Sequence, residues 1–545
     1  MNTQKIVKIS IGVILLFLAS CQSVDVSENS IAKSLSDPNP DTILKNRSAN
    51  LLSKKELVKL LRQKNGAVKA SQKADELFRT PFVDNSFYEK YGLPKPSMNP
   101  ILGPSLRVST WNVEKSINVR EVAQSLSSEQ YFIDHLKEDV LDDKEGYKEA
   151  LRQRADLAHS DILLCQEMDI GHCRSGYLFA AQHLAKHLGM NFAYASQQLE
   201  IDPVYLGEDL SFGNTTIDHE ACKILEGKEG SYNGVFGVAV LSRYPIKHVE
   251  VFQLENQPYD WYDGEIQKPD FLEQGRRYGA EQLFKVKPVR EVKRGGRGFT
   301  RVDLHVPNVP HETISVINIH LEIKTKPENR VKQIEEILSY IHEIENPVIM
   351  AGDFNNSSRD VSSTSLSRAT SRAAKSPSTF LSAGLFLANA TGVNQLRAIV
   401  NGYKNFQDPL AWGVPVILPN KTKPLFKKIE NFRFKDGGAF DFRGDDERSM
   451  RGVDGVLSNS NQRSRFKGFT QTFRLPKPIG PLGCERLDWI FVKSFLTDPK
   501  DKKGSYQLAP HFGETLSLVN QSVHEAFSDH HPITTILPLN EPEDL

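Results

Sequence analysis

The sequence lacks an excess of charge of either sign. Its 545 residues contain 68 Lys and Arg against 68 Asp and Glu, so the formal net charge is zero. No global field therefore selects nucleic acid or a membrane surface as a partner. A local basic strip runs from Arg276 to Arg301, opposed only by Glu281 and Glu291. This strip could collect a polyanionic substrate, or it could be the solvated face of a hairpin.

Cysteine is scarce, and internal repeats and long low-complexity tracts are absent. The chain has five cysteines, and none shows the Cys/His spacing of a zinc site. Cys165 lies in an apolar run from 162 to 165 and is expected to be a buried thiol. Cys173 and Cys222 lie in loop-like sequence and could pair in an oxidising compartment, while Cys484 has no assigned partner.

Hydrophobic runs long enough to span a bilayer are also missing. The apolar run from Ile11 to Leu18 is too short, and it follows the basic residues Lys5 and Lys8. Leu18-Ala19-Ser20-Cys21 resembles a bacterial lipobox, which predicts a signal peptide over 1–21 and lipidation of Cys21; the alternative is a plain secretory signal. The lipobox implies a protein anchored to a membrane in the bacterial cell envelope, facing the periplasm or the exterior. The protein is expected to be a monomer.

The chain divides into a leader, an accessory segment and one large domain. Residues 22 to about 50 are rich in Ser, Asp, Asn and Pro and are typical of a tether, and residues 53–78 have the spacing of one or two amphipathic helices. Together they form an accessory segment over 22–103. The main domain is predicted over 104–540, with surface insertions around 357–378 and 400–480 that either shape substrate access or lack fixed structure.

Short β-rich runs alternate with helical stretches through the main domain. Strands are expected at 106–111, 162–165, 237–243, 299–306, 314–321 and 347–351, and helices at 121–159, 177–188 and 328–344.

Six polar motifs follow apolar runs in this domain. They are Thr110-Trp111-Asn112, Gln166-Glu167, Asn318-Ile319-His320-Leu321, Gly352-Asp353-Phe354-Asn355, Arg486-Leu487-Asp488-Trp489 and Ser528-Asp529-His530-His531-Pro532. A polar residue in this position projects from the end of a buried strand into a cleft. Hard oxygen ligands together with two histidines suit metal-assisted hydrolysis of a phosphate ester.

The motifs in this order resemble the endonuclease/exonuclease/phosphatase family, which includes DNase I-like nucleases, inositol polyphosphate 5-phosphatases and bacterial sphingomyelinases. The resemblance covers residues 104 to 538 and implies an α/β (α+β) fold: two stacked mixed β-sheets flanked by helices, a four-layer DNase I-like sandwich. It also implies a divalent cation, Mg²⁺ or Mn²⁺, with Asn112 and Glu167 at the metal.

The resemblance assigns roles to the other motif residues as well. His320 contacts the phosphate, Asp353 and Asn355 position the attacking water or the transition state, and Asp488 supports the site. His530, oriented by Asp529, abstracts a proton from water, whereas His531 is structural. Arg297, in Gly295-Gly296-Arg297-Gly298, matches a recurrent family segment and is a possible substrate-binding residue.

The sequence thus predicts a metal-dependent phosphoesterase that cleaves phosphodiesters, with a nuclease as one form of it. The alternatives are a lipid or inositol phosphatase, a sphingomyelinase-like enzyme, or a non-catalytic binding protein on the same fold. The substrate would be nucleic acid, phospholipid or a sugar phosphate. A membrane-active enzyme would need an exposed apolar hairpin, for which Trp261, Tyr262 and Trp412 lie in candidate loops.

Overall fold

The computed structural model describes ten parts of the chain. They are residues 43–63, 67–100, 102–201, 232–266, 291–356, 423–440, 469–479, 482–493, 508 and 512–539. The signal peptide with Cys21, Trp412, most of both expected insertions and most of the basic strip lie outside these residues. Among the described residues, no helix combines the length and apolar character needed to cross a membrane.

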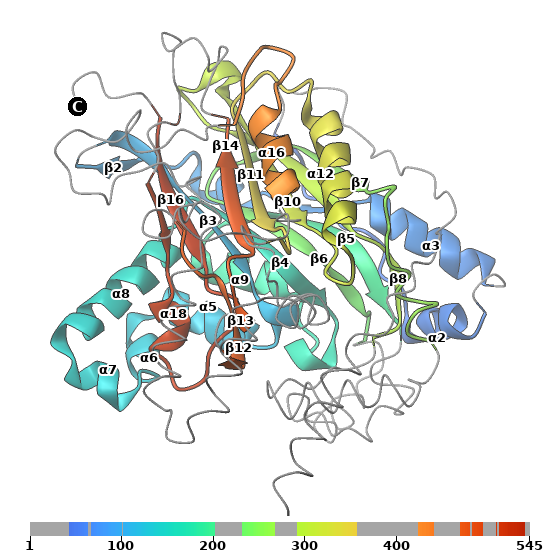
Figure 1. Ribbon diagram of the computed structural model, residues 1–545, viewed down its shortest axis with the longest axis horizontal. Helices are drawn as coiled ribbons and strands as arrows, with labels where there is room; N and C mark the ends of the chain where they lie inside the picture. Colours follow the sequence, from blue (N-terminus) through green and yellow to red (C-terminus); the bar gives the residue numbers. More distant parts are fainter. Residues whose placement is uncertain are drawn as a thin grey trace, which may run out of the picture.

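Two mixed β-sheets form the centre of the molecule (Figure 1). The larger sheet has the order β1-β5-β6-β4-β3-β16-β15, with β2 added to β3 and β8 to β5; the smaller has the order β14-β11-β10-β9-β7. The strands of the larger sheet are β1 Phe82–Asp84, β2 Ser97–Asn99, β3 Gly103–Asn112, β4 Ile162–Ile170, β5 Asn191–Glu200, β6 Val235–Ser242, β8 Lys293–Gly295, β15 Phe512–Thr515 and β16 Ile533–Pro538. Those of the smaller sheet are β7 Ile246–Gln253, β9 Gly298–His305, β10 Thr313–His320, β11 Val348–Asp353 and β14 Asp488–Val492, while β12 Phe473–Ile479 and β13 Leu482–Glu485 pair separately.

Strand alternation explains how the sheets stack. In β11, Ile349 faces the core between the two sheets, whereas Val348 and Met350 face the helices outside. In β4, Leu164 faces the inter-sheet core and Leu163 the opposite side. Because successive side chains of a strand point to opposite faces, each sheet is apolar on both sides and must be covered twice.

Helices supply the outer cover. The smaller sheet packs against α12 (Pro327–Ile341) and α16 (Lys423–Asn431). The larger sheet packs against α2 (Lys54–Arg62), α3 (Val68–Arg79), α5 (Val119–Ser127), α8 (Lys144–Ala158) and α9 (Ala180–Leu188). The shorter helices are α4 Ser86–Tyr91, α6 Glu129–Ile133, α7 Glu138–Asp142 and α18 Leu518–Gln521. The result is the four-layer sandwich that the family resemblance implies.

One expectation is confirmed in more detail and another needs correction. The helical stretch expected at 121–159 consists of four helices, α5 to α8. The tether was expected to reach about residue 50, but the Leu44 amide donates to the Ile246 carbonyl and Arg47 pairs with Val83, so 43–50 belong to the folded domain. Leu44 and Ala49 of this segment are partly buried against the apolar cores, and Arg47 extends the sheet beyond the edge of β1.

The structure describes two of the cysteines with their side chains, Cys165 and Cys173. Cys165 is a buried free thiol, as predicted. Cys173 forms a disulfide, and both Cys222 and the side chain of Cys484 lie outside the described residues.

A polar contact crosses the otherwise apolar space between the sheets. The Gln166 Nε2 of β4 donates to Asn318 Oδ1 of β10 at 2.8 Å and to Thr110 Oγ1 at 3.0 Å. Asn318 Nδ2 in turn donates to the carbonyls of Cys165 and Ala239 at 3.1 and 2.8 Å. The pairing of β4 with β6 shifts register just after Cys165, so Asn318 occupies the point where the ladder is irregular.

Candidate active site

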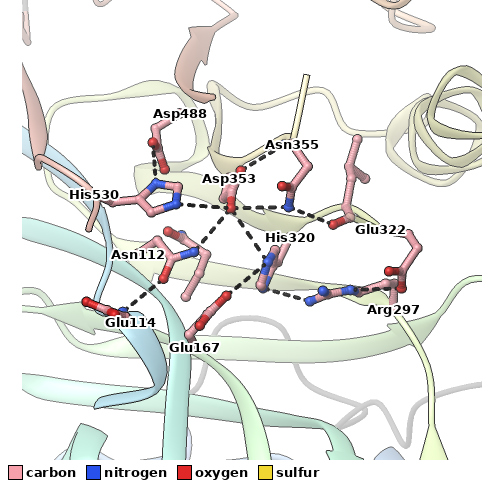
Figure 2. Close-up of polar contacts among 12 residues, drawn as sticks. Asn112, Glu114, Glu167, Arg297, His320, Glu322, Asp353, Asn355, Asp488 and His530 are labelled. Carbon is pink, nitrogen blue, oxygen red and sulfur yellow. Dashed lines mark hydrogen bonds and ion pairs between the residues drawn. The ribbon is translucent and has the colours of Figure 1, made fainter. Parts of the chain in front are cut away.

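The six motifs meet at one end of the sandwich. β3 and β4 are parallel and place Asn112 level with Gln166, while β10 and β11 are parallel and place His320 level with Asp353. β14 runs antiparallel to β11 and sets Asp488 directly opposite Asp353. β16 runs antiparallel to β3, so the segment before it returns to the same end. Residues more than 400 positions apart thereby line one site (Figure 2).

Asp353 lies at the centre of this site. Its carboxylate accepts from Asn112 Nδ2 at 3.1 Å, from the Asn355 amide at 2.7 Å and from Asn355 Nδ2 at 3.2 Å. The Nε2 atoms of His320 and His530 lie 3.6 and 3.9 Å from it. Burial raises the Asp353 pKa to about 7, opposed by His530 and reinforced by Asp488. The predicted residues Asn112, Asp353 and Asn355 thus form one hydrogen-bonded group.

His530 is paired with Asp488, which corrects the expectation that Asp529 orients it. His530 Nδ1 lies 2.8 Å from Asp488 Oδ2. The Asp529 amide instead donates to Glu114 at 2.9 Å. Burial alone would lower the His530 pKa, but Asp488, Asp529 and Asp353 outweigh it and raise that pKa well above 6.5. Adjacent residues in an extended chain point in opposite directions, which is why the neighbour in sequence is not the partner in space.

The backbone around His530 is fixed from several sides. Trp111 Nε1 and Asn520 Nδ2 donate to the His530 carbonyl at 2.8 and 2.6 Å, and the His530 amide donates to Ser528 Oγ at 3.0 Å. His531 directs its ring to the side chains of Asn520 and Gln521, which agrees with a structural role. Burial lowers the His531 pKa to about 4.

His320 has a different partner. Its Nδ1 lies 2.9 Å from Arg297 Nη1, and its Nε2 faces Asp353 and Glu167 at 3.6 and 3.7 Å. Burial, followed by the Arg297 charge, lowers the His320 pKa well below 6.5. Arg297 itself is buried and bonds Glu322 Oε2 at 3.3 Å. The structure therefore brings Arg297 to the site but directs its guanidinium at His320 and Glu322.

Glu167 is held by a strained turn after Asn112. Glu114, Lys115 and Ser116 have φ values of 45°, 54° and 55°, and Glu167 has 59°. The Lys115 amide donates to Glu167 Oε2 at 3.1 Å, and Ser116 Oγ donates to the Glu167 carbonyl at 3.0 Å. Consecutive non-glycine residues in this left-handed region are costly and persist only where surrounding contacts impose them. Such strain is common at functional sites.

Glu114 is the site residue that sequence reasoning missed. Burial and the nearby Asp529 charge raise its pKa to about 8, and Glu167 contributes to the same shift. Burial likewise raises the Asp529 pKa to about 6, opposed by His530 and reinforced by Glu167. The only sequence signal was an acid two positions after Asn112, in the same loop.

This donor set fits a divalent cation. Glu114, Glu167 and Asp529 form a mutually repelling group of carboxylates, and such crowding is relieved by a bound cation with a preference for oxygen. Asp353, Asp488 and His530 also present ligand atoms within 4.8 Å of one another. Asn112 Oδ1 accepts from the Glu114 amide at 3.1 Å, so it shapes the same loop.

A buried ionic network lies behind Glu167. Arg174 bonds Asp169 and Glu200 at 2.7 and 2.8 Å, and Glu291 accepts from Lys293 at 2.6 Å and pairs with Lys115. Lys293 and Arg297, at the end of the expected basic strip, are both buried and paired. These two cations therefore support the site from within.

Comparison with known protein families identifies a matching family model. The family model described as Endonuclease/Exonuclease/phosphatase family matches residues 109–530. No curated protein sequence matches the chain.

Similar solved structures have low sequence identity. They include an endonuclease/exonuclease/phosphatase from Beutenbergia cavernae (13% identity, 80% of this chain and 72% of that one, TM-score 0.36) and an AP endonuclease from Archaeoglobus fulgidus (14%, 79% and 99%, 0.34). Another is sphingomyelinase C from Streptomyces griseocarneus (11%, 80% and 99%, 0.32). Because the family model spans most of its length, this chain belongs to the endonuclease/exonuclease/phosphatase family.

Proposed function

We propose that the protein is a divalent-metal-dependent phosphoesterase that hydrolyses phosphodiester bonds. The observation that carries this proposal is the convergence of His530–Asp488, His320–Arg297 and the carboxylates Glu114, Glu167 and Asp529 around Asp353. A cation held by Glu167, with Glu114 and Asp529 beside it, would neutralise phosphate charge and polarise the phosphoryl oxygen. Mg²⁺ suits these oxygen donors, and Mn²⁺ is the alternative.

The side chains divide the remaining work. His530 has Nδ1 occupied by Asp488, so only Nε2 is available to exchange a proton with water or a leaving group. His320 can donate to a phosphoryl oxygen as charge develops there. Asn355 already donates from Nδ2 to the Leu321 carbonyl and to Asp353, so its role is to position Asp353. Asp353 holds Asn112 and Asn355 in register and faces both histidines.

A phosphodiester suits the site better than a phosphomonoester because of charge. Carboxylates dominate the described part of the site: Asp488 pairs with His530, Asp353 faces both histidines, and Glu114, Glu167 and Asp529 interact with one another. The guanidinium that the described residues bring to His320, that of Arg297, is already paired with Glu322. A diester carries one negative charge per phosphate, whereas a monoester near neutral pH carries more and would meet stronger repulsion. Within this class of reaction, we propose nuclease activity as the more specific function.

Membrane insertion through the loop of Trp261 finds no support in the described residues. Trp261 and Tyr262 are both buried, and Trp261 Nε1 donates to Glu322 at 3.1 Å. A sphingomyelinase-like activity would therefore need another membrane contact.

The test is an activity screen of purified residues 22–545 with bis-aryl and mono-aryl phosphates, DNA, RNA, sphingomyelin and inositol phosphates. We expect cleavage of diesters with Mg²⁺ or Mn²⁺ and loss of cleavage in EDTA. Full activity in EDTA would overturn the metal requirement, and monoester-only turnover would overturn the diester preference. Inactivity toward every ester, with the fold intact, would favour a binding protein on this fold.

Lipid anchoring at Cys21 is a separate proposal, supported by the lipobox-like sequence alone. Cys21→Ala should move the protein from the membrane fraction to the soluble fraction without changing kcat. Retention on membranes after a high-salt wash would locate the anchor elsewhere.

A further inference from the structure

Arg297 lies where the chain crosses from one sheet to the other. β8, which ends at Gly295, belongs to the larger sheet and β9 to the smaller, and Gly296-Arg297 joins them. Gly295 has φ 91°, and a Cβ there would lie 2.3 Å from the Gln197 carbonyl oxygen, so this turn requires glycine. The Arg297 amide donates to Gln257 Oε1 at 2.8 Å, and its carbonyl accepts from Leu254 at 3.0 Å. The backbone of Arg297 is therefore fixed.

A chain of buried contacts aligns its guanidinium. Glu322 Oε2 accepts from Arg297 Nε at 3.3 Å and from Trp261 Nε1 at 3.1 Å, while Glu322 Oε1 accepts from the Lys324 amide at 2.8 Å. Trp261 is held between two ammonium groups, Lys293 at 4.7 Å and Lys324 at 4.5 Å from its ring centroid. The next residue, Tyr262, donates its hydroxyl to the Leu61 carbonyl of α2 at 2.7 Å. The accessory helices thus support this chain of contacts.

The chemistry of the Arg297–His320 contact determines where the imidazole carries its proton. A guanidinium has only N–H donors and stays protonated in proteins. The nitrogen of His320 that lies 2.9 Å from Arg297 Nη1 is Nδ1, which must therefore offer its lone pair. In neutral imidazole the single proton then resides on Nε2, the atom that faces Asp353 and Glu167. A carboxylate partner, as at His530, would select the opposite tautomer.

We propose that Arg297, aligned by Glu322 and Trp261, is a positioning residue that sets His320 as an Nε2–H donor aimed into the active site. Its contribution to turnover rests on the phosphoesterase function proposed above, because the acceptor would be a phosphoryl oxygen in the transition state. The tautomer itself is a property of the protein without substrate.

The first test measures that tautomer directly. In protein labelled with ¹⁵N-histidine, the spectrum of His320, assigned by its disappearance in His320→Gln, should show a pyridine-type Nδ1 and a protonated Nε2. Arg297→Met should convert it to a tautomer mixture or to Nδ1–H. Arg301→Met is the matched control, because Arg301 lies four residues away on β9 and pairs with Asp303 and Glu250, outside these contacts; it should leave the signal unchanged.

The second test measures catalysis with the diester substrate. Arg297→Met should lower kcat by up to roughly 10²-fold, the scale for one oriented transition-state donor, with little change in KM. Arg297→Lys, which keeps a donor and the charge, should restore part of kcat. Trp261→Phe, which removes only the Nε1 donor to Glu322, is a milder variant if Arg297→Met fails to fold, and it should lower kcat less.

The outcomes of these tests distinguish the positioning role of Arg297 from the proposed phosphoesterase function. A protonated Nδ1 in the wild-type protein, or a tautomer unchanged by both Arg297→Met and Trp261→Phe, would overturn it even if the enzyme is fully active. A shifted tautomer with unchanged kcat would remove the catalytic part of the proposal. An Nε2–H tautomer that depends on Arg297 in a chain without esterase activity would support the positioning role and count against the proposed function.

Discussion

The two histidines of the site are the same side chain in opposite surroundings. His530 faces Asp488 at 2.8 Å, and His320 faces Arg297 at 2.9 Å. Both rings are buried, and burial alone lowers the pKa of each. The partner decides the result: the His530 pKa is raised well above 6.5, and the His320 pKa is lowered well below it.

This difference assigns separate roles to the two residues. His530 can hold a proton and exchange it through Nε2, as a general acid–base group must. His320 stays neutral near physiological pH and can only donate or accept a hydrogen bond. Each strand end therefore carries the imidazole in the form that its neighbour imposes, and the residue type alone would not distinguish them.

The largest effect should come from removing the acid–base group. His530→Ala should lower kcat by at least roughly 10²-fold, because His530 is the imidazole that a carboxylate orients, whereas His320 is paired with a guanidinium. Steady-state kinetics on a diester would measure the loss, with circular dichroism to confirm folding. Near-normal turnover in a folded variant would end the proposed role of His530.

The second-largest effect should come from replacing Asp488, the carboxylate that orients His530. Asp488→Asn should lower kcat by roughly 10- to 10²-fold, because an amide can donate to His530 Nδ1 and move its proton to Nε2. Asp529→Asn should cost less in kcat and more in cation affinity, since Asp529 interacts with Glu114 and Glu167. A double variant at 488 and 530 should lose far less than the product of both effects. If Asp529→Asn proves the more severe change in kcat, the pairing seen in the structure is not the working one.

Cation binding should depend on pH because protons compete for the same carboxylates. The Asp529, Asp353 and Glu114 pKa values are raised to about 6, 7 and 8. In the absence of a cation, these groups contribute stability that is present below their unfolded values near 4 and lost as pH rises through the folded values.

The apparent Mg²⁺ affinity should therefore rise between about pH 6 and 8. Thermal unfolding at a series of pH values, with and without Mg²⁺, would measure this linkage. Glu114→Gln is the matched variant. It should reduce the rise of Mg²⁺ affinity at the high-pH end, near the Glu114 pKa of about 8. If the stabilisation by Mg²⁺ does not change with pH, these carboxylates do not bind the cation.

The smallest effect should come from the histidine next to His530. His531→Gln should leave kcat within a few-fold, because the His531 ring contacts Asn520 and Gln521 and not the site. Its cost should appear as about 1–2 kcal/mol of stability, the range for disturbing buried hydrogen bonds. Denaturant unfolding would measure it, and a large fall in kcat at unchanged stability would contradict the division between the two neighbours.

Sequence patterns predicted several strands and the motif residues because strand ends are marked by apolar runs that stop at a polar residue, whereas the sandwich followed from the family resemblance. β11, ending at Asp353, and β10, ending at His320, follow this rule. β5 was not predicted, since Asn191–Glu200 contains Ser and Gln residues that look exposed in sequence yet are buried in the structure. The contacts between motif residues were harder to predict than the residues themselves. Asp488 and Glu114 reach His530 and Asp529 from other strands and loops, and a tertiary contact leaves no periodic signal in the sequence.

The amide pair Gln166 and Asn318 has a consequence for how accurately the two halves of this molecule can be aligned. Asn112, Glu167 and His530 stand on or beside one sheet, and His320, Asp353 and Asp488 on or beside the other. Aliphatic contacts between stacked sheets tolerate sliding, because one methyl group replaces another at little cost. Directional amide contacts do not, and a displacement of about an ångström would break them together. The Gln166–Asn318 pair therefore fixes the position of one sheet relative to the other. Two buried amide side chains thus determine whether the site residues of the two sheets come together.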